Sequence, residues 1–269
     1  MELPIQTSVA AVLKASRMAL SHDEAVSAQF SPRAGAYVTS PVHAAGEDLD
    51  LLEQVLEIRR PARVLDLGTG GGHVAFRAAP FATQVVAYDL SDAMLEQVAA
   101  EATRRGHANI ATRQGFAESL PFEDASFDAV LTRFSAHHWH DVPRALAEAR
   151  RVLGPGGIAV FIDVVAPESP LADTWLQSLE LMRDPSHVRD YRRSEWLATL
   201  AEAGFAATIS RDFRLRMEFS SWVARIGTPE PLVAGLRCLQ AQAPAEVASH
   251  FGLEQDGSFT VESALIEAE

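Results

Sequence analysis

The chain has 269 residues, enough to bury a full hydrophobic core in one elaborated domain, and two independent domains are not expected. Its 36 acidic and 23 basic residues give a net charge of −13 without a concentrated basic patch, which argues against a nucleic-acid-binding protein. The single cysteine, Cys238, excludes an internal disulfide and a thiolate zinc site, and no apolar run approaches membrane-spanning length, so we expect a cytoplasmic protein outside the membrane.

Residues 1–45 are predicted to form an N-terminal arm or lid. The informative part is the segment from Phe30 to Tyr37, FSPRAGAY, which places two aromatic residues around proline and glycine. Such a segment suits either a flap over a ligand or ordinary packing. An amphipathic helix is expected next, from the helical spacing of four apolar residues, Leu49, Leu52, Val55 and Leu56.

The stretch from Arg63 to His73, RVLDLGTGGGH, is the motif around which the chain is organised. Val64 to Leu67 have the apolar character of a buried parallel strand, and His73 to Ala79 indicate the helix that follows. The glycines between them allow unusual backbone angles and the close approach of a ligand to backbone N–H groups at the positive end of a helix. This pattern is typical of a cofactor-binding turn.

Asp66 helps to decide which cofactor fits the turn. A dinucleotide motif, G-x-G-x-x-G/A, fails when it starts at Gly68, because its sixth position is His73. The frame starting at Gly70 fits, but it begins late and leaves the Asp66 carboxylate at the strand tip, where it would repel a pyrophosphate. S-adenosylmethionine has no phosphates and carries a cationic sulfonium, so it is compatible with an acid there.

The second predicted strand, residues 84–89, ends in Asp89, which lies 21 residues beyond Gly68. In a βαβ unit this spacing brings the carboxylate beside the glycine turn, where it can accept the hydroxyls of a ribose. Asp89 could instead cap the next helix, expected over 93–105, but Ser91 or Asp92 is available for that role.

The third strand, expected over 109–114, leads to Phe116 and Ala117. The Phe116 ring could stack on an adenine or belong to the core. The fourth strand, 127–132, brings three histidines to its carboxyl end, where open α/β sheets place substrate. These residues, His137, His138 and His140, are too close in sequence for a three-ligand face and have no nearby acid that completes a familiar site, so no metal is predicted.

The remaining part of the chain completes the sheet and adds a cap. Asp141 is expected to cap a helix, and the next strand, 158–164, contains Asp163, a candidate pocket acid. Two further strands are expected over 206–213 and 258–268. Between them and before them, cap elements are predicted over about 167–200 and 214–256, because these stretches are too long for simple connections.

Together the motifs resemble those of class I S-adenosylmethionine-dependent methyltransferases of the ubiquinone and menaquinone biosynthesis type, with the closest similarity to an uncharacterised bacterial branch. Four segments carry the resemblance: Asp66-x-Gly68-x-Gly70-x-Gly72, AESLPF, SAHHWHD and FSSWVAR. The resemblance implies an α/β, Rossmann-like, doubly wound sheet of seven strands with the last strand antiparallel, plus an N-terminal arm and a helical cap. It places the methyltransferase domain at 46–269.

The resemblance also implies the site residues and the chemistry. The methyl donor is S-adenosyl-L-methionine and the acceptor a small molecule, with in-line displacement at the sulfonium carbon. The implied cofactor-binding residues are Asp66, Gly68, Gly70, Gly72, Asp89, Leu90, Phe116, Ala117, Arg133 and Tyr37. His138 is the first candidate catalytic residue and His137 the second, either to take a proton from the acceptor or to orient it.

Phe116 departs from the family pattern, which commonly has an acid there to hold the adenine amino group. Two other classes of function remain open from the residues. One is a non-catalytic S-adenosylmethionine-binding module, and the other is a nucleotide-cofactor oxidoreductase.

Overall fold

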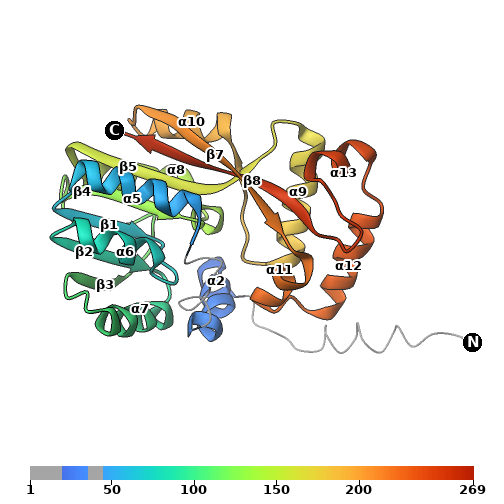
Figure 1. Ribbon diagram of the computed structural model, residues 1–269, viewed down its shortest axis with the longest axis horizontal. Helices are drawn as coiled ribbons and strands as arrows, with labels where there is room; N and C mark the ends of the chain where they lie inside the picture. The colour runs from blue at the N-terminus through green and yellow to red at the C-terminus, as the bar shows by residue number, and fades with distance from the viewer. Residues whose placement is uncertain (1–19, 36–44) are drawn as a thin grey trace, which may run out of the picture.

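The computed structural model describes residues 20–35 and 45–269, and Tyr37 with the remainder of the predicted arm lies outside these ranges. The strands are β1 (Arg63–Leu67), β2 (Gln84–Asp89), β3 (Ile110–Gln114), β4 (Phe127–Arg133), β5 (Leu153–Ala166), β6 (Tyr191–Arg192), β7 (Ala207–Met217) and β8 (Phe259–Ala268). Seven of them form the order β3-β2-β1-β4-β5-β8-β7, while the short β6 pairs with β5 (Figure 1). β8 is antiparallel to both β5 and β7, which confirms the predicted sheet with its antiparallel last strand.

The helices mostly begin and end where the sequence provides caps. They are α2 (His22–Phe30), η1 (Ser31–Arg33), α5 (Glu47–Arg59), α6 (His73–Ala78), η2 (Ala79–Phe81), α7 (Asp92–Arg105), η3 (Ala136–His138), α8 (Val142–Val152), α9 (Pro170–Arg183), α10 (Arg193–Glu202), α11 (Phe219–Ile226), α12 (Glu230–Ala241) and α13 (Ala245–Phe251). The Ser91 hydroxyl accepts the Met94 N–H at 3.3 Å and thereby caps α7. None of these described helices is long and apolar enough to cross a bilayer.

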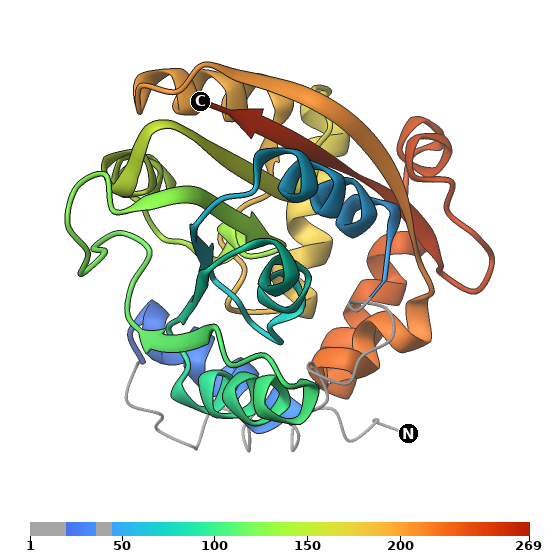
Figure 2. The ribbon, with the colours of Figure 1, turned by 60° about the vertical axis from the view of Figure 1, so that its left-hand side comes forward.

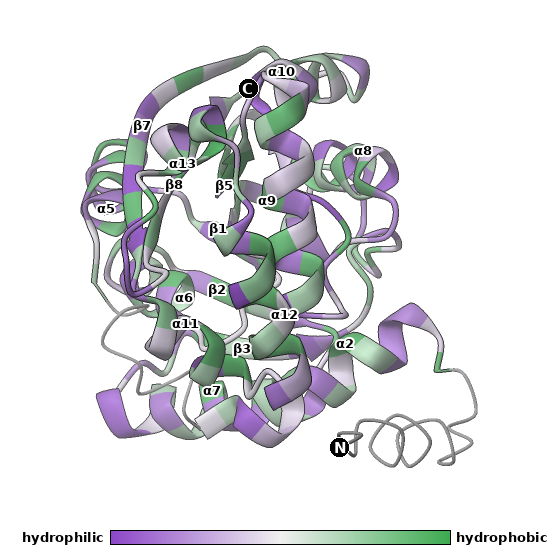
Figure 3. Ribbon diagram, turned by 90° about the vertical axis from the view of Figure 1, so that its right-hand side faces the viewer, coloured by the Kyte–Doolittle hydropathy of each residue, from purple (hydrophilic) through white to green (hydrophobic). Residues whose placement is uncertain are grey.

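A group of helices lies beside the sheet, and we refer to this group as the cap. α9, α11, α12 and α13 gather there, and the hairpin of β7 and β8 runs from the sheet to them (Figures 1 and 2). α9 and α12 carry both hydrophobic and hydrophilic residues, consistent with helices that bury one side (Figure 3). Their common core includes Trp222, whose ring meets Phe259 of β8 edge-on at 5.0 Å between centroids. α10 instead packs on the sheet, because Trp196 and Leu200 belong to the core beneath it.

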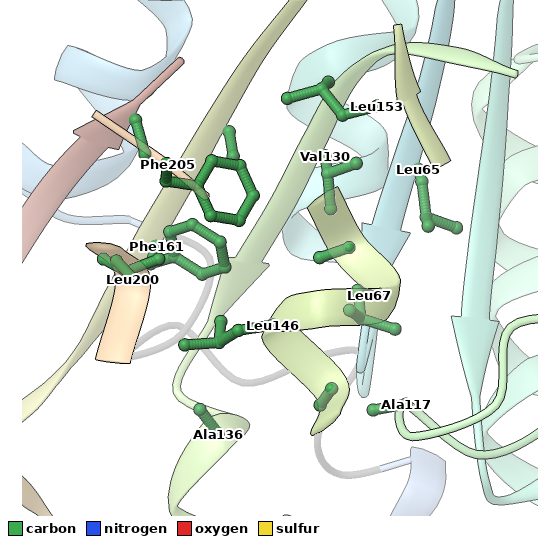
Figure 4. Close-up of a cluster of buried hydrophobic side chains, with 14 of the residues drawn as sticks. Leu65, Leu67, Ala117, Val130, Ala136, Leu146, Leu153, Phe161, Leu200 and Phe205 are labelled. Atoms are coloured by element: carbon green, nitrogen blue, oxygen red, sulfur yellow. The ribbon is translucent and has the colours of Figure 1, made fainter. Parts of the chain in front are cut away.

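Both faces of the sheet are covered by helices, as the apolar run in β1 predicts. Val64 packs with α5, α6 and α7, whereas Leu65 and Leu67 point to the other face, toward α8 and α10. Figure 4 shows this second face, where Phe161 and Phe205 pack against one another with their ring centroids 5.8 Å apart. Both layers hold the carboxyl ends of the central strands at one edge, where the candidate site lies.

Candidate active site

A cavity of about 640 Å³ opens at the carboxyl ends of β1, β2 and β4. Its wall includes the glycine turn after β1, the ends of β2 and β4, the loop with the histidines, and parts of α2, α9, α11 and β7. In this class of fold, ligands bind in such a crevice outside the strand ends. The cavity therefore brings together most of the residues that the sequence singled out.

The glycines of the turn have different roles. At Gly68, with φ of 73°, an added Cβ would lie 1.9 Å from the Ser135 hydroxyl, so this position is closed by packing. At Gly70, with φ of 48°, an added Cβ would meet nothing within 4 Å, and the residue lines the cavity. Gly72 is again crowded, 2.9 Å from the Phe76 ring. Gly70 is therefore the glycine of the motif whose backbone is left open to a ligand.

Asp66 is buried and holds the turn together. Its Oδ2 accepts the Thr69 hydroxyl at 2.5 Å and the Ala75 N–H at 2.9 Å. Burial raises the pKa of Asp66 to about 7, although these hydrogen bonds lower it. Because Asp66 also lines the cavity, its ionisation near neutral pH changes the charge that a ligand meets.

Asp89 lies beside the turn, as its spacing predicts. One oxygen accepts the Gly70 N–H at 2.8 Å and the other accepts the Ser91 N–H at 2.9 Å. Burial raises the pKa of this carboxyl, while the backbone hydrogen bonds work in the opposite direction. A carboxylate oxygen can accept more than one hydrogen bond, and Asp89 lines the cavity together with Leu90.

Phe116 is 45% exposed and lines the cavity, so its ring does not belong to the core. Ala117 beside it is buried and also contributes to the wall. Arg133, in contrast, forms a buried ion pair with Asp48 of α5, and its guanidinium lies 4.6 Å from the centre of the Phe134 ring. Phe116 thus offers an aromatic ring to a ligand in the cavity, whereas the charge of Arg133 is paired with Asp48 within the protein.

His137 is paired with the candidate pocket acid. Its Nδ1 lies 2.6 Å from Oδ1 of Asp163, which is 4% exposed. Burial works to lower the pKa of His137, but the Asp163 carboxylate and the hydrogen bond to it prevail and raise the pKa to about 9.

His138 is held in a fixed orientation. Its Nδ1 lies 3.0 Å from the Ser186 carbonyl oxygen, and the Phe30 ring meets it edge-on at 5.0 Å between centroids. Because a carbonyl only accepts, Nδ1 carries the proton and Nε2 is left with a lone pair. Burial and the neighbouring charge of His137 lower the pKa of His138 to about 4, so the ring is neutral at neutral pH.

The described part of the predicted arm reaches both sides of the cavity. The Ser31 and Ser91 hydroxyls are 3.0 Å apart, and the Gln29 amide donates to the Ile226 carbonyl of α11 at 3.2 Å. His22 Nε2 lies 2.8 Å from the His138 carbonyl oxygen. α2 and η1 therefore connect the sheet-side wall with the cap.

The sequence analysis missed the polar segment between α9 and β6, of which Asp184, His187 and Asp190 line the cavity. His187 and His137 have ring centroids 5.6 Å apart, and burial together with the charge of His137 lowers the pKa of His187 to about 2. The clustering of Asp and His in residues 184–190 was the available signal. It acquires meaning only because β6 pairs with the end of β5 and so brings this segment beside Asp163.

Comparisons with known proteins show which family the chain belongs to. Residues 65–161 match the methyltransferase domain family Methyltransf_11. The uncharacterized protein YafE of Escherichia coli is 49% identical over 201 residues, which cover 75% of this chain and 97% of YafE. The uncharacterized methyltransferase YcgJ of Bacillus subtilis is 40% identical over 200 residues, 74% of this chain and 79% of YcgJ.

A solved structure is similar to this chain over most of its length. The crystal structure of a putative methyltransferase from Bacillus halodurans superimposes with a TM-score of 0.80 at 36% identity, covering 83% of this chain and 98% of that one. The chain therefore belongs to the class I S-adenosylmethionine-dependent methyltransferases, a family whose methyl donor is S-adenosylmethionine.

Proposed function

We propose that this protein transfers a methyl group from S-adenosylmethionine to a small-molecule acceptor held in the same cavity. The observation that carries the proposal is the continuity of that cavity. It joins Gly70, Asp89 and Phe116 on one side with His137 and His138 on the other. Donor and acceptor can therefore meet without either one leaving the protein.

The donor side fits S-adenosylmethionine group by group. The open backbone at Gly70 admits its amino-acid part, and the remaining acceptor capacity of Asp89 suits the two ribose hydroxyls. The exposed face of Phe116 suits the adenine ring, in place of the acid common in the family. Asp66 favours a positively charged ligand. Arg133 is paired with Asp48 and Tyr37 lies outside the described residues, so the fit of the donor does not depend on either of them.

Positioning is the main contribution that we assign to the protein. S-adenosylmethionine supplies a methyl carbon activated by a positively charged sulfur. The walls of the cavity hold the acceptor in line with that carbon, and α2 and the cap exclude water. Such orientation can contribute roughly 7 to 11 kcal/mol when the geometry is ideal. No covalent bond between protein and methyl group is needed.

His138 is assigned to the acceptor side. Its Nδ1 is occupied by the Ser186 carbonyl and its ring is held by Phe30, so Nε2 is a fixed hydrogen-bond acceptor. A hydroxyl or amine of the acceptor can donate to it and thereby present its lone pair to the methyl carbon. This role requires orientation of the acceptor rather than a change in the charge of the ring.

Calorimetric titration with S-adenosylmethionine, S-adenosylhomocysteine and NAD tests the donor. Binding of the first two but not of NAD is expected, and selective binding of NAD would overturn the proposal in favour of an oxidoreductase. Incubation with methyl-labelled S-adenosylmethionine and a metabolite extract then tests transfer. Label is expected in a small molecule, whereas cofactor binding without any transfer across extracts would support a non-catalytic binding module.

A further inference from the structure

A compact cluster of one histidine and two aspartates lies on the acceptor side of the cavity. His137 comes from η3, Asp163 from β5, and Asp190 from the segment just before β6. One potential ligand atom from each of them lies within 4.8 Å of the others. Ligand atoms around a single cation have separations of this size, because each lies about 2 to 2.5 Å from the ion.

Two oxygens of this cluster have no hydrogen-bond donor among the described residues. They are Oδ2 of Asp163 and Oδ2 of Asp190, whose residues are 4% and 2% exposed. The other oxygen of Asp163 already accepts from Val164 N–H and pairs with His137. Buried carboxylate oxygens without a donor are unfavourable, so the presence of two of them in so compact a cluster points to a positively charged ligand.

The cation inside the cluster is His137, which pairs with Asp163, and two arginines whose charges act on this part of the cavity pair with other acids. Arg183 pairs with Glu180 at 3.3 Å. Arg189 pairs with Asp173 at 3.0 Å, away from the cluster.

The other polar side chains nearby do not satisfy Asp190 either. His187 Nε2 is 3.2 Å from Gln177 Oε1 and 3.8 Å from Asp190 Oδ2, which is too far for a hydrogen bond to the aspartate. Asp184 accepts from the N–H and hydroxyl of Ser186, so it is satisfied within its own turn. The charge of Asp190 is thus the one in this cluster that the described side chains leave without a direct partner.

We propose that His137, Asp163 and Asp190 form a site for a divalent metal ion. Two carboxylates and one imidazole suit ions that accept mixed oxygen and nitrogen ligands, such as Mn²⁺, Mg²⁺ or Zn²⁺. Three protein ligands leave coordination positions open toward the cavity. The metal ion would take the place of the proton between His137 and Asp163 and would neutralise Asp190.

The site also points to an acceptor class, and this part rests on the proposed function. A metal ion stabilises an oxygen anion, so the acceptor would carry a hydroxyl or enol oxygen that reaches the open positions. That hydroxyl, held by its hydrogen bond to His138 Nε2, loses its proton to solvent as an oxygen lone pair forms the bond to the methyl carbon. The carbon–sulfur bond breaks with its electron pair on sulfur, which leaves S-adenosylhomocysteine and the methyl ether.

Titration of the metal-stripped full-length protein with Mn²⁺, followed by electron paramagnetic resonance, tests the site without an acceptor. One ion per chain is expected, and Asp190→Asn should weaken its binding by about tenfold or more. The matched control is Asp212→Asn, which removes the same charge from another part of the cavity wall, where Asp212 pairs with Arg193 at 2.8 Å. It should leave Mn²⁺ binding unchanged.

Two further measurements keep the outcome decisive. Spin-echo modulation in the wild-type protein should show one imidazole nitrogen bound to Mn²⁺, so the result does not depend on a variant that folds. Asp190→Asn should keep the affinity for S-adenosylmethionine, which separates this proposal from that of the donor site. Absence of Mn²⁺, Mg²⁺ and Zn²⁺ binding, or equal binding by Asp190→Asn and the wild-type protein, would overturn the proposed metal site. Asp190 would then be buried in its protonated form.

Discussion

The proposed donor and acceptor sides of the cavity are built in different ways. On the donor side, Asp66 and Asp89 each accept backbone N–H groups from the turn or helix nearby. On the acceptor side, Asp163 and Asp190 come from separate segments, and each has an oxygen without a donor among the described residues. Carboxylates whose hydrogen bonds are made by nearby backbone groups can bind one cofactor regardless of the reaction. Buried carboxylate oxygens without a donor, in contrast, require a ligand that supplies the missing positive charge or hydrogen bond. We therefore propose that the specificity of this enzyme resides in the acceptor side.

If the two sides differ in this way, a substitution on the donor side should weaken S-adenosylmethionine binding more than a substitution on the acceptor side. Gly70→Val should have the largest effect, a loss of S-adenosylmethionine binding of more than about a hundredfold, because it places a branched side chain where the backbone must meet the ligand. Calorimetry measures the dissociation constant. Gly106→Val is the matched control: Gly106 also has a positive φ, 77°, and open space around its Cβ position, but it ends α7 away from the cavity. An equal loss of affinity in the two variants would show that backbone strain, and not the side chain in the cavity, weakens binding.

Asp89→Ala should follow, with a loss of about a hundredfold or more in affinity for S-adenosylmethionine. Two hydrogen bonds to a carboxylate contribute roughly 1.5 to 3 kcal/mol each. Asp92→Ala removes a nearby exposed acid from the first turn of α7 and should change the affinity little. Because Asp89 also accepts the Gly70 N–H, thermal unfolding should be compared for both variants. A dissociation constant unchanged by Asp89→Ala would remove Asp89 from the donor site.

The raised pKa of Asp66 predicts a smaller, pH-dependent effect on stability and on S-adenosylmethionine affinity. Its folded pKa of about 7 lies above the ordinary value of 3.8, so the folded state retains a proton that the unfolded chain releases. The contribution of Asp66 to stability is therefore greatest at low pH and is lost as the pH rises from about 4 to about 7. Binding of a cation has the opposite dependence, because it favours the carboxylate.

Affinity for S-adenosylmethionine should consequently rise about tenfold between pH 6 and pH 8, in line with one coupled ionisation. Asp66→Asn should lose this part of the pH dependence, and the difference between the two proteins cancels any titration of the ligand itself. A wild-type profile that Asp66→Asn reproduces would show that Asp66 serves only the turn.

The same contrast explains what could be predicted from the sequence. The strands, the turn from Gly68 to Gly72 and the position of Asp89 follow from short patterns and one spacing, because a βαβ unit has little freedom. The need for glycine at position 68 cannot be predicted in this way, because the Ser135 hydroxyl that a Cβ there would meet comes from the end of another strand. His137 and Asp190 are more than fifty residues apart and meet only because β6 pairs with β5. The spacing of the histidines alone therefore argued against a metal, whereas the fold supplies the two acids.

The smallest effect on donor affinity is expected for His138→Asn, although turnover should fall by roughly tenfold to a hundredfold as the acceptor loses its orientation. The asparagine amide can still donate to the Ser186 carbonyl, so the variant removes the atom at Nε2 while it retains the anchoring hydrogen bond. His140→Asn is the control, because that ring is exposed and lies 3.2 Å from Glu118. With an acceptor in hand, rates at saturating S-adenosylmethionine measure the effect. Full turnover in His138→Asn, or a loss of donor affinity equal to the loss of rate, would move His138 out of the acceptor side.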